Sequence, residues 1–109
     1  EDRRSLALHA AIADRLRIDP NALLPQANAS LARMRSLHGG AHPLLDEWKT
    51  LLRRPLPALL SVFADPSPWA RELRQVTPFS GVLSARERAR VYRAFASADR
   101  ASTSMVKAS

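Results

Sequence analysis

Apolar side chains recur along this chain at intervals of three and four residues, which is the period of an amphipathic α-helix. The first such stretch runs from about Arg3 to Ile18, and His9 lies within its apolar stripe. Alternating runs of β-branched residues, which would indicate strands, do not occur. The pattern predicts an all-α protein that forms a single compact domain of five or six short helices.

Proline and glycine mark the limits of a second predicted helix. Asp19-Pro20 supplies an N-cap followed by a first-turn proline. Pro25 then falls inside the helix, so we expect a break or kink near Leu24. Gly39-Gly40 is expected to end the helix, with one of the two glycines in the left-handed conformation.

Three further short helices are predicted before residue 76. His42-Pro43 begins one that carries Trp48, Pro55 and Pro57 begin the next, and Ser67-Pro68 begins a third. The apolar loop that follows, residues 77–83, is expected to plug the core. The predicted core comprises Trp48, Leu51, Leu52, Leu60, Phe63, Phe79, Val91 and Phe95.

Ser84 and Glu87 have the spacing of a capping box, which predicts that the last helix begins there. At about 100° per residue, two opposite faces follow. One carries the candidate binding residues Arg86, Arg90, Arg93 and Arg100, and the other carries Val91, Phe95 and Ala98. Beyond Arg100 the pattern fades. We therefore expect a helical domain over residues 1–100 and a frayed tail over 101–109.

The excess of positive charge in the last third of the chain makes the last helix a candidate binding surface. The 109-residue chain has a formal net charge of +7, and residues 67–109 hold 8 basic against 3 acidic side chains. Such asymmetry suggests an acidic partner, either a nucleic acid or an acidic protein surface. Routine surface arginine explains it equally well. The arginine stripe is accordingly compatible with a solvated face, a protein-binding face or a DNA-binding face.

Little in the sequence points to catalysis, a cofactor or a metal. There is no cysteine, which fits a reducing cytoplasm, and no apolar run approaches the roughly 20 residues that span a bilayer. His38, His42 and Asp46 have ligand spacing, but Gly39-Gly40 and Pro43 interrupt the helix that would align them. His9 is expected to be a hydrogen-bonded packing residue. We therefore expect a protein that is not an enzyme.

Several segments resemble a family of small, uncharacterised bacterial helical proteins. They are Ser5-Leu6-Ala7-Leu8-His9, His38-Gly39-Gly40-Ala41-His42-Pro43, and Leu73-Arg74-Gln75 leading to Pro78-Phe79-Ser80-Gly81-Val82-Leu83-Ser84. Members of that family look like the small partner in two-gene toxin–antitoxin arrangements. The resemblance covers about Ser5 to Phe95 and implies a toxin-like bacterial partner, but no functional residues.

Together these observations predict a non-enzymatic, antitoxin-like binding module that occludes a cognate bacterial protein. The alternative is a DNA-binding transcriptional regulator that uses the basic last helix. A small enzyme or metal protein is the third hypothesis. No membrane partner is expected, and a homodimer fits a chain too small to bury every apolar helix face alone.

Overall fold

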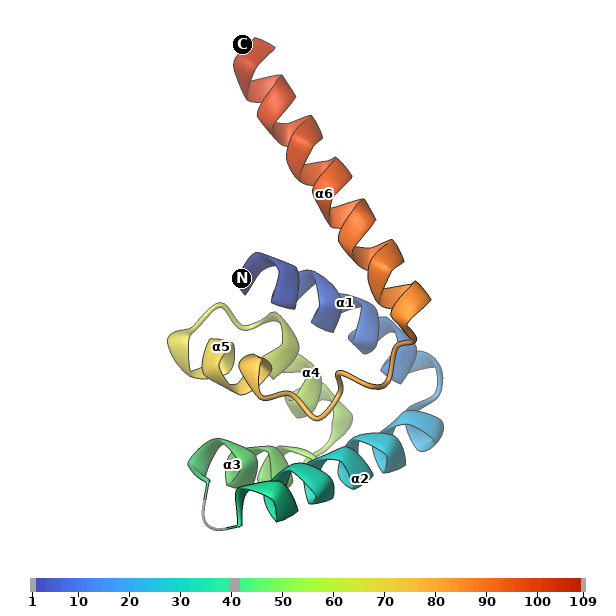
Figure 1. Ribbon diagram of the computed structural model, residues 1–109, viewed down its shortest axis with the longest axis vertical. Helices are drawn as coiled ribbons and strands as arrows, with labels where there is room; N and C mark the ends of the chain where they lie inside the picture. The colour runs from blue at the N-terminus through green and yellow to red at the C-terminus, as the bar shows by residue number, and fades with distance from the viewer. Residues whose placement is uncertain (1, 40–41, 109) are drawn as a thin grey trace.

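Six helices make up the described part of the chain in a computed structural model (Figure 1). They are α1 (Asp2–Ile18), α2 (Pro20–His38), α3 (Pro43–Leu51), α4 (Leu56–Ala64), α5 (Pro68–Gln75) and α6 (Ala85–Ala108). The structure describes residues 2–39 and 42–108, with their side chains except those of Asp2, Asp99 and residues 101–108. No strand occurs in these residues, which confirms the predicted all-α class.

Helix α1 is the central element of the fold. It packs against α2, α4, α5 and α6, whereas α3 packs against α2 and α5. In Figure 1, α6 starts beside the C-terminal part of α1 and rises from the body on that side, and α2 with α3 form the opposite side of the body. Ile12 and Leu16 of α1 are completely buried, because this helix is covered on most of its faces.

The predicted helix starts and stops are confirmed in the caps. The Asp19 carboxylate accepts a hydrogen bond from the Ala22 N–H at 3.2 Å, and the Ser67 hydroxyl accepts one from the Ala70 N–H at 3.2 Å. Gly39 ends α2 with a φ of 64°, and its N–H donates to the Arg35 carbonyl. A residue with a Cβ would be strained at that φ, so glycine suits this position.

Of the break or kink expected near Leu24, the break does not occur, and a kink stays a prediction. Helix α2 continues through Pro25 to His38 without interruption. Leu23, Ala27 and Leu31 on either side of the proline are buried against the body of the protein. Their packing holds the segment helical although Pro25 supplies no N–H for the Asn21 carbonyl, so tertiary contact outweighs the local preference.

Aromatic rings form the centre of the core. The Phe63 and Phe79 rings meet edge to face at 5.1 Å between centroids, and Trp48 packs against both. The Trp48 Nε1–H donates to the Leu73 carbonyl at 2.8 Å, which ties α3 to α5. Phe79 lies on the loop between α5 and α6, so this loop plugs the core as predicted, with Val82 and Leu83 also buried.

Four residues of the predicted core lie nearer its edge. Leu52, Leu60, Val91 and Phe95 are half-buried. The core instead gains fully buried side chains from the centre of α1 and from the inner faces of the short helices: Ile12, Leu16, Leu45, Leu59 and Leu73. The difference arises because periodicity identifies an apolar face, whereas only the tertiary arrangement decides how completely another element covers it.

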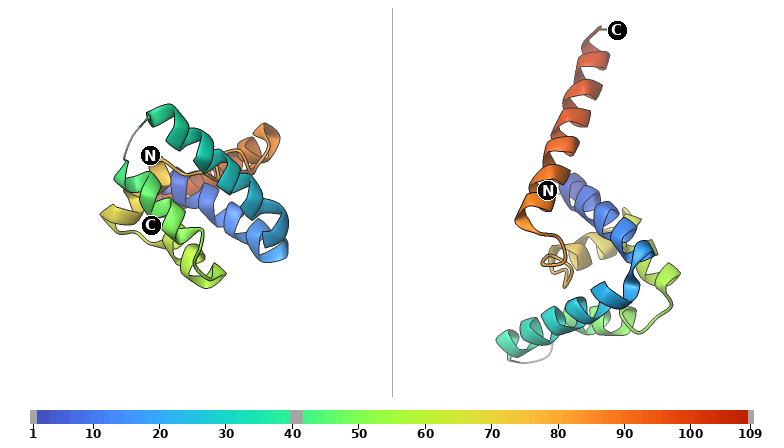
Figure 2. Two further views of the ribbon diagram at one scale, coloured as in Figure 1. Left: turned by 90° about the horizontal axis from the view of Figure 1, so that it is seen from below. Right: turned by 90° about the vertical axis from the view of Figure 1, so that its right-hand side faces the viewer.

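Helix α6 projects from the body, as Figure 1 and the right-hand view of Figure 2 show. The radius of gyration is 15.3 Å, against about 13 Å expected for a compact chain of this length. The backbone of α6 is helical to Ala108. The side chains of the tail expected to fray lie outside the described residues, so fraying stays a prediction. In the described part of the chain, no helix combines the length and apolar character that crossing a bilayer requires.

Candidate functional site

The start of α6 is fixed by the predicted capping box. The Glu87 N–H donates to the Ser84 hydroxyl at 3.1 Å, and the Glu87 carboxylate accepts from the Ser84 N–H at 3.0 Å. Arg15 of α1 also forms an ion pair with Glu87. The backbone hydrogen bond from Ser84 is the main reason that the pKa of Glu87 is lowered, with a smaller contribution from Arg15. These contacts join the first turn of α6 to α1.

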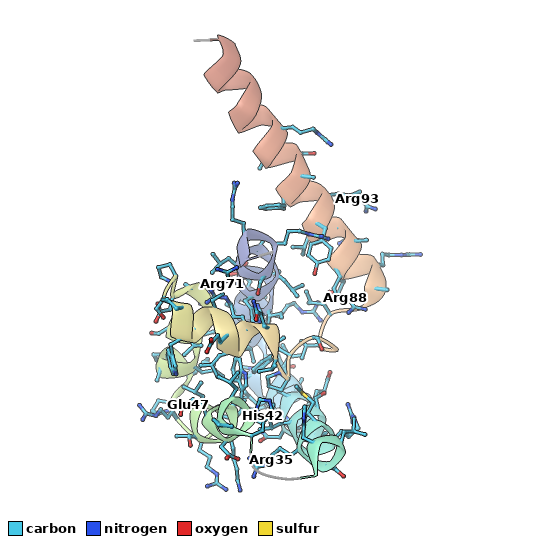
Figure 3. All side chains as sticks on the ribbon, turned by 60° about the vertical axis from the view of Figure 1, so that its left-hand side comes forward. Arg35, His42, Glu47, Arg71, Arg88 and Arg93 are labelled. Atoms are coloured by element: carbon cyan, nitrogen blue, oxygen red, sulfur yellow. The ribbon has the colours of Figure 1, made fainter. Side chains whose placement is uncertain are left out.

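Four exposed arginines form what we call the arginine face of α6. It consists of Arg86, Arg90, Arg93 and Arg100. Figure 3 shows Arg93 extending from α6 on the side away from the body of the protein. The sequence-predicted stripe therefore exists as a surface, and its first three members lie on the part of α6 that α1 supports.

Within the described side chains, Arg86, Arg90 and Arg93 form no ion pair with a carboxylate. Arg100 donates a long hydrogen bond, 3.5 Å, to the Ser97 hydroxyl. Guanidinium groups that have no carboxylate partner among the described side chains are suited to bidentate binding of carboxylates or phosphates. The arginine face can therefore bind an anionic surface.

The opposite face of α6 packs on α1, but only over its first part. Val91 is half-buried against the core, and the Arg3 guanidinium lies 5.5 Å from the centroid of the Phe95 ring. Ala98, which was assigned to the buried face, is exposed. That assignment is wrong because α6 leaves the body, so a residue of correct helical phase meets no partner there (Figure 1).

The pair α5 and α6 lacks the arrangement of a helix-turn-helix. Residues 76–84 separate them, and this loop enters the core through Phe79. Helix α6 packs chiefly on α1. A recognition helix needs a short turn and a supporting helix packed against it. A nucleic acid contact through α6 would therefore not use the geometry of a helix-turn-helix.

The histidines near the α2–α3 connection are occupied by packing and capping. The His38 and His42 rings meet edge to face at 4.7 Å, and His42 Nδ1 accepts a hydrogen bond from the Leu45 N–H. Asp46 forms an ion pair with Arg35. Among the described residues, no group of three potential ligands could hold a metal ion.

A polar pocket of about 290 Å³ lies where α1, the end of α5 and α6 meet. Its lining comprises Arg4, Ser5, Leu8, His9, Arg74, Gln75, Thr77 and Tyr92. Every lining residue except Leu8 carries a polar or charged group, and none of these described residues is acidic. We call this site the α1–α5–α6 pocket.

Arg74 is the least expected member of this pocket, since its side chain is almost completely buried. Its guanidinium Nη1 donates to the carbonyls of Val62 and Asp65, at 3.0 and 2.6 Å. These carbonyls lie at the C-terminal end of α4, where carbonyls have no partner within the helix and the helix dipole is negative. Arg74 therefore caps α4 from α5.

His9 is buried beside Arg74 and is held in one orientation. Its Nδ1–H donates to the Ser5 carbonyl at 2.8 Å, and its ring meets Phe63 edge to face at 5.2 Å. Burial lowers the pKa of His9 from 6.5 to about 4; the Ser5 hydrogen bond opposes this, and Arg74 lowers the pKa slightly further. His9 is thus neutral at pH 7. It acts as a hydrogen-bonded packing residue.

Sequence reasoning overlooked the pocket because its members are far apart in the chain. One signal was available: Arg74 follows Leu73 and lies four residues after Ala70, on the apolar face of its short helix. A charged residue at such a position needs buried partners. Nothing local, however, indicates that Arg4 and Tyr92 complete the lining.

Comparison with known proteins found no matching protein family, no similar curated protein and no similar solved structure. The resemblance to antitoxin-like proteins therefore stays a prediction.

Proposed function

We propose that this protein is a non-enzymatic binding module of the antitoxin kind, which occludes an acidic surface of a second bacterial protein. The observation that carries the proposal is the arginine face. It is exposed on a helix that projects from the body, and Arg86, Arg90 and Arg93 have no carboxylate partner among the described side chains.

The geometry suits occlusion of a cleft. The 24 residues of α6 span about 36 Å at 1.5 Å per residue. Arg86 and Arg93 are seven residues apart, about 10 Å along the axis, so the cations are spaced over two turns. A cleft that binds divalent metal ions is lined with acidic groups, and a cationic helix would approach it quickly and cover it.

The test is coexpression of the full chain with the product of the adjacent gene. We expect the two proteins to copurify and the neighbour's effect on growth to be relieved. The triple variant Arg86→Gln, Arg90→Gln, Arg93→Gln should weaken the complex at least about tenfold, since several charged contacts are lost.

A matched control removes equal charge elsewhere. Arg53, Arg54 and Arg71 are also exposed, and they lie on other elements. The variant in which all three are replaced by glutamine should keep the affinity within about twofold. Charges distant from an interface act on the partner only through long-range electrostatic attraction, which salt screens. Equal weakening by both triple variants, or the absence of both copurification and growth rescue, contradicts the proposal.

DNA binding is the second candidate, favoured by the same arginines, which could neutralise backbone phosphates. It predicts that the protein changes the electrophoretic mobility of promoter DNA at low salt. The logarithm of the binding constant should fall linearly with the logarithm of the salt concentration. The α6 triple variant should abolish that change. If promoter DNA shows no change in electrophoretic mobility with the protein at low salt, this candidate is excluded.

A further inference from the structure

We propose that two arginines in the first turn of α1 fix the direction of α6, and with it the direction in which the arginine face points. The Arg4 guanidinium lies over the Tyr92 ring, 4.3 Å from its centroid, and the Arg3 guanidinium lies over the Phe95 ring at 5.5 Å. We call these four residues the aromatic clasp. The inference deepens the proposed function, and it rests on that function only where it concerns the partner.

Helix α6 is anchored to the body at its start. Leu83 is buried in the core, and the capping box of Ser84 and Glu87 begins the helix directly after it. The later part of α6 leaves the body (Figure 1 and the right-hand view of Figure 2). A helix anchored at one end can swing about that end, so contacts further along α6 must set its direction.

The distance of a contact from this anchor decides how well it fixes the direction. Along the helix axis, Glu87 lies about 4.5 Å beyond Ser84, whereas Tyr92 lies about 12 Å beyond it. Arg100 lies about 24 Å beyond the same point. A movement of about 1 Å at Tyr92 therefore becomes about 2 Å at Arg100, whereas the same movement at Glu87 becomes about 5 Å. The Arg15–Glu87 ion pair fixes the direction less well than the aromatic clasp does.

Val91 restrains α6 in a different direction. It is half-buried against the core, and it lies about 100° around the helix from Tyr92. Packing at Val91 alone leaves α6 able to tilt at a right angle to that contact. The Arg4–Tyr92 contact opposes this second tilt, so the two contacts together define one direction.

The location of Arg3 and Arg4 supports a role directed at α6. Both lie in the first turn of α1, where the positive end of the helix dipole disfavours cations. Both guanidinium groups nevertheless lie within the roughly 6 Å over which an aromatic ring attracts a cation. A residue that opposes its local preference while it makes a specific tertiary contact indicates that the tertiary contact is its purpose.

The aromatic clasp leaves the arginine face uncovered. Tyr92 and Phe95 lie outside the stripe of arginines around α6, so a partner can cover that face while the clasp is formed. A helix whose direction is already fixed loses less entropy when it binds. Arg4 and Tyr92 are therefore positioning residues, whereas the residues of the arginine face would touch the partner.

The test measures the distance between two spin labels in the full chain by pulsed electron paramagnetic resonance. The chain has no cysteine, so Ser61→Cys on α4 and Ala98→Cys on α6, both at exposed positions, carry the only labels. We expect one narrow distribution of distances. Tyr92→Leu and Arg4→Gln should each at least about double its width, because α6 then swings about its start. Tyr92→Phe is the matched control and should leave the width unchanged, since the ring is retained.

A label pair within the body controls for folding. Thr50→Cys with Ser61→Cys, both at exposed positions, should give a narrow distribution in every variant. Arg4 is exposed, so Arg4→Gln tests the clasp even if Tyr92→Leu loosens the body. Three results overturn the proposal: a broad α4–α6 distribution in the unchanged protein, an unchanged width in both Tyr92→Leu and Arg4→Gln, or equal broadening in Tyr92→Phe and Tyr92→Leu.

The affinity for the product of the adjacent gene gives a second readout. Tyr92→Leu should weaken the complex about threefold or more, because binding must then restore the direction of α6, and Tyr92→Phe should bind as the unchanged protein does. Equal affinity of Tyr92→Leu and the unchanged protein overturns the positioning role. The spin-label distances involve no partner, so the absence of any complex contradicts the proposed function and leaves the clasp to be judged by those distances.

Discussion

At the scale of single residues, two buried polar side chains decide much of the chemistry inside this protein. Arg74 and His9 lie side by side between α1, α4 and α5, in a region otherwise filled by Phe63 and its apolar neighbours. Arg74 donates to backbone carbonyls at the end of α4, and His9 donates to the Ser5 carbonyl. Buried polar groups are stable only with such partners, so both residues should be sensitive to change.

Replacement of Arg74 by methionine should lower the free energy of unfolding by about 2–4 kcal/mol, because the Val62 and Asp65 carbonyls lose their donor. Urea denaturation followed by circular dichroism measures this loss. Arg71→Met, at an exposed position of the same helix, serves as the control and should stay within about 0.5 kcal/mol. Equal stability of the two variants contradicts the capping role.

The stability of the protein should fall in mildly acidic solution because of His9. Its pKa is about 4 in the folded protein and 6.5 when exposed, so the unfolded chain binds the proton more readily between these values. The free energy of unfolding should decrease by roughly 1.5 kcal/mol between pH 6.5 and pH 5, above the range in which Glu87 titrates.

Denaturation at a series of pH values checks this expectation. His9→Leu should flatten the dependence over that interval, whereas His38→Gln, at an exposed position, should retain it. A dependence that is as steep in His9→Leu as in the unchanged protein rules out His9 as its source.

At the scale of elements, helix ends follow local chemistry and helix interiors follow packing. Asp19, Ser67 and the Ser84–Glu87 pair make the cap contacts that their positions in the sequence predict. Pro25 is the exception to local reasoning, since α2 tolerates it. Caps depend on neighbours in sequence, whereas the continuity of α2 depends on Leu23, Ala27 and Leu31 being buried.

Pro25→Ala should therefore stabilise the protein by about 1 kcal/mol or more. Alanine restores an N–H for the Asn21 carbonyl and is the better helix former by about 3 kcal/mol, part of which is offset by the greater freedom of the unfolded chain. Pro25 is exposed, so no core contact is lost. A lower melting temperature for Pro25→Ala would contradict this expectation, because it would mean that Pro25 stabilises the folded protein.

At the scale of the whole molecule, the main feature is a helical body with one projecting helix. α1 organises the body, and α6 is joined to α1 by the Arg15–Glu87 ion pair and by Val91. The arginine face extends along this helix from the supported part to Arg100. This arrangement presents cations without covering them, which a helix embedded in the body could not do.

A chain ended after Arg100 should keep the stability of the full chain within about 0.5 kcal/mol, because the backbone it removes projects from the body (Figure 1). Its radius of gyration, measured by small-angle X-ray scattering, should be smaller than that of the full chain, because the Cα radius of 15.3 Å exceeds the roughly 13 Å expected of a compact chain of this length. A loss of several kcal/mol would show that residues beyond Arg100 contribute to the body.

The sequence by itself determined the all-α class, the helix starts, the caps and the identity of the arginine face. These features depend on residues within one or two turns of each other, so their physical causes are visible in the order of residues. Gly39 and the Ser84–Glu87 pair are examples in which a few neighbouring positions suffice.

Only the tertiary structure decided how deeply each apolar face is buried, whether α2 continues through Pro25, and where α6 leaves the body. It alone brought Arg4, Arg74 and Tyr92 together around one pocket. Each of these outcomes depends on contacts between residues that are distant in the chain, and periodicity carries no information about which faces meet.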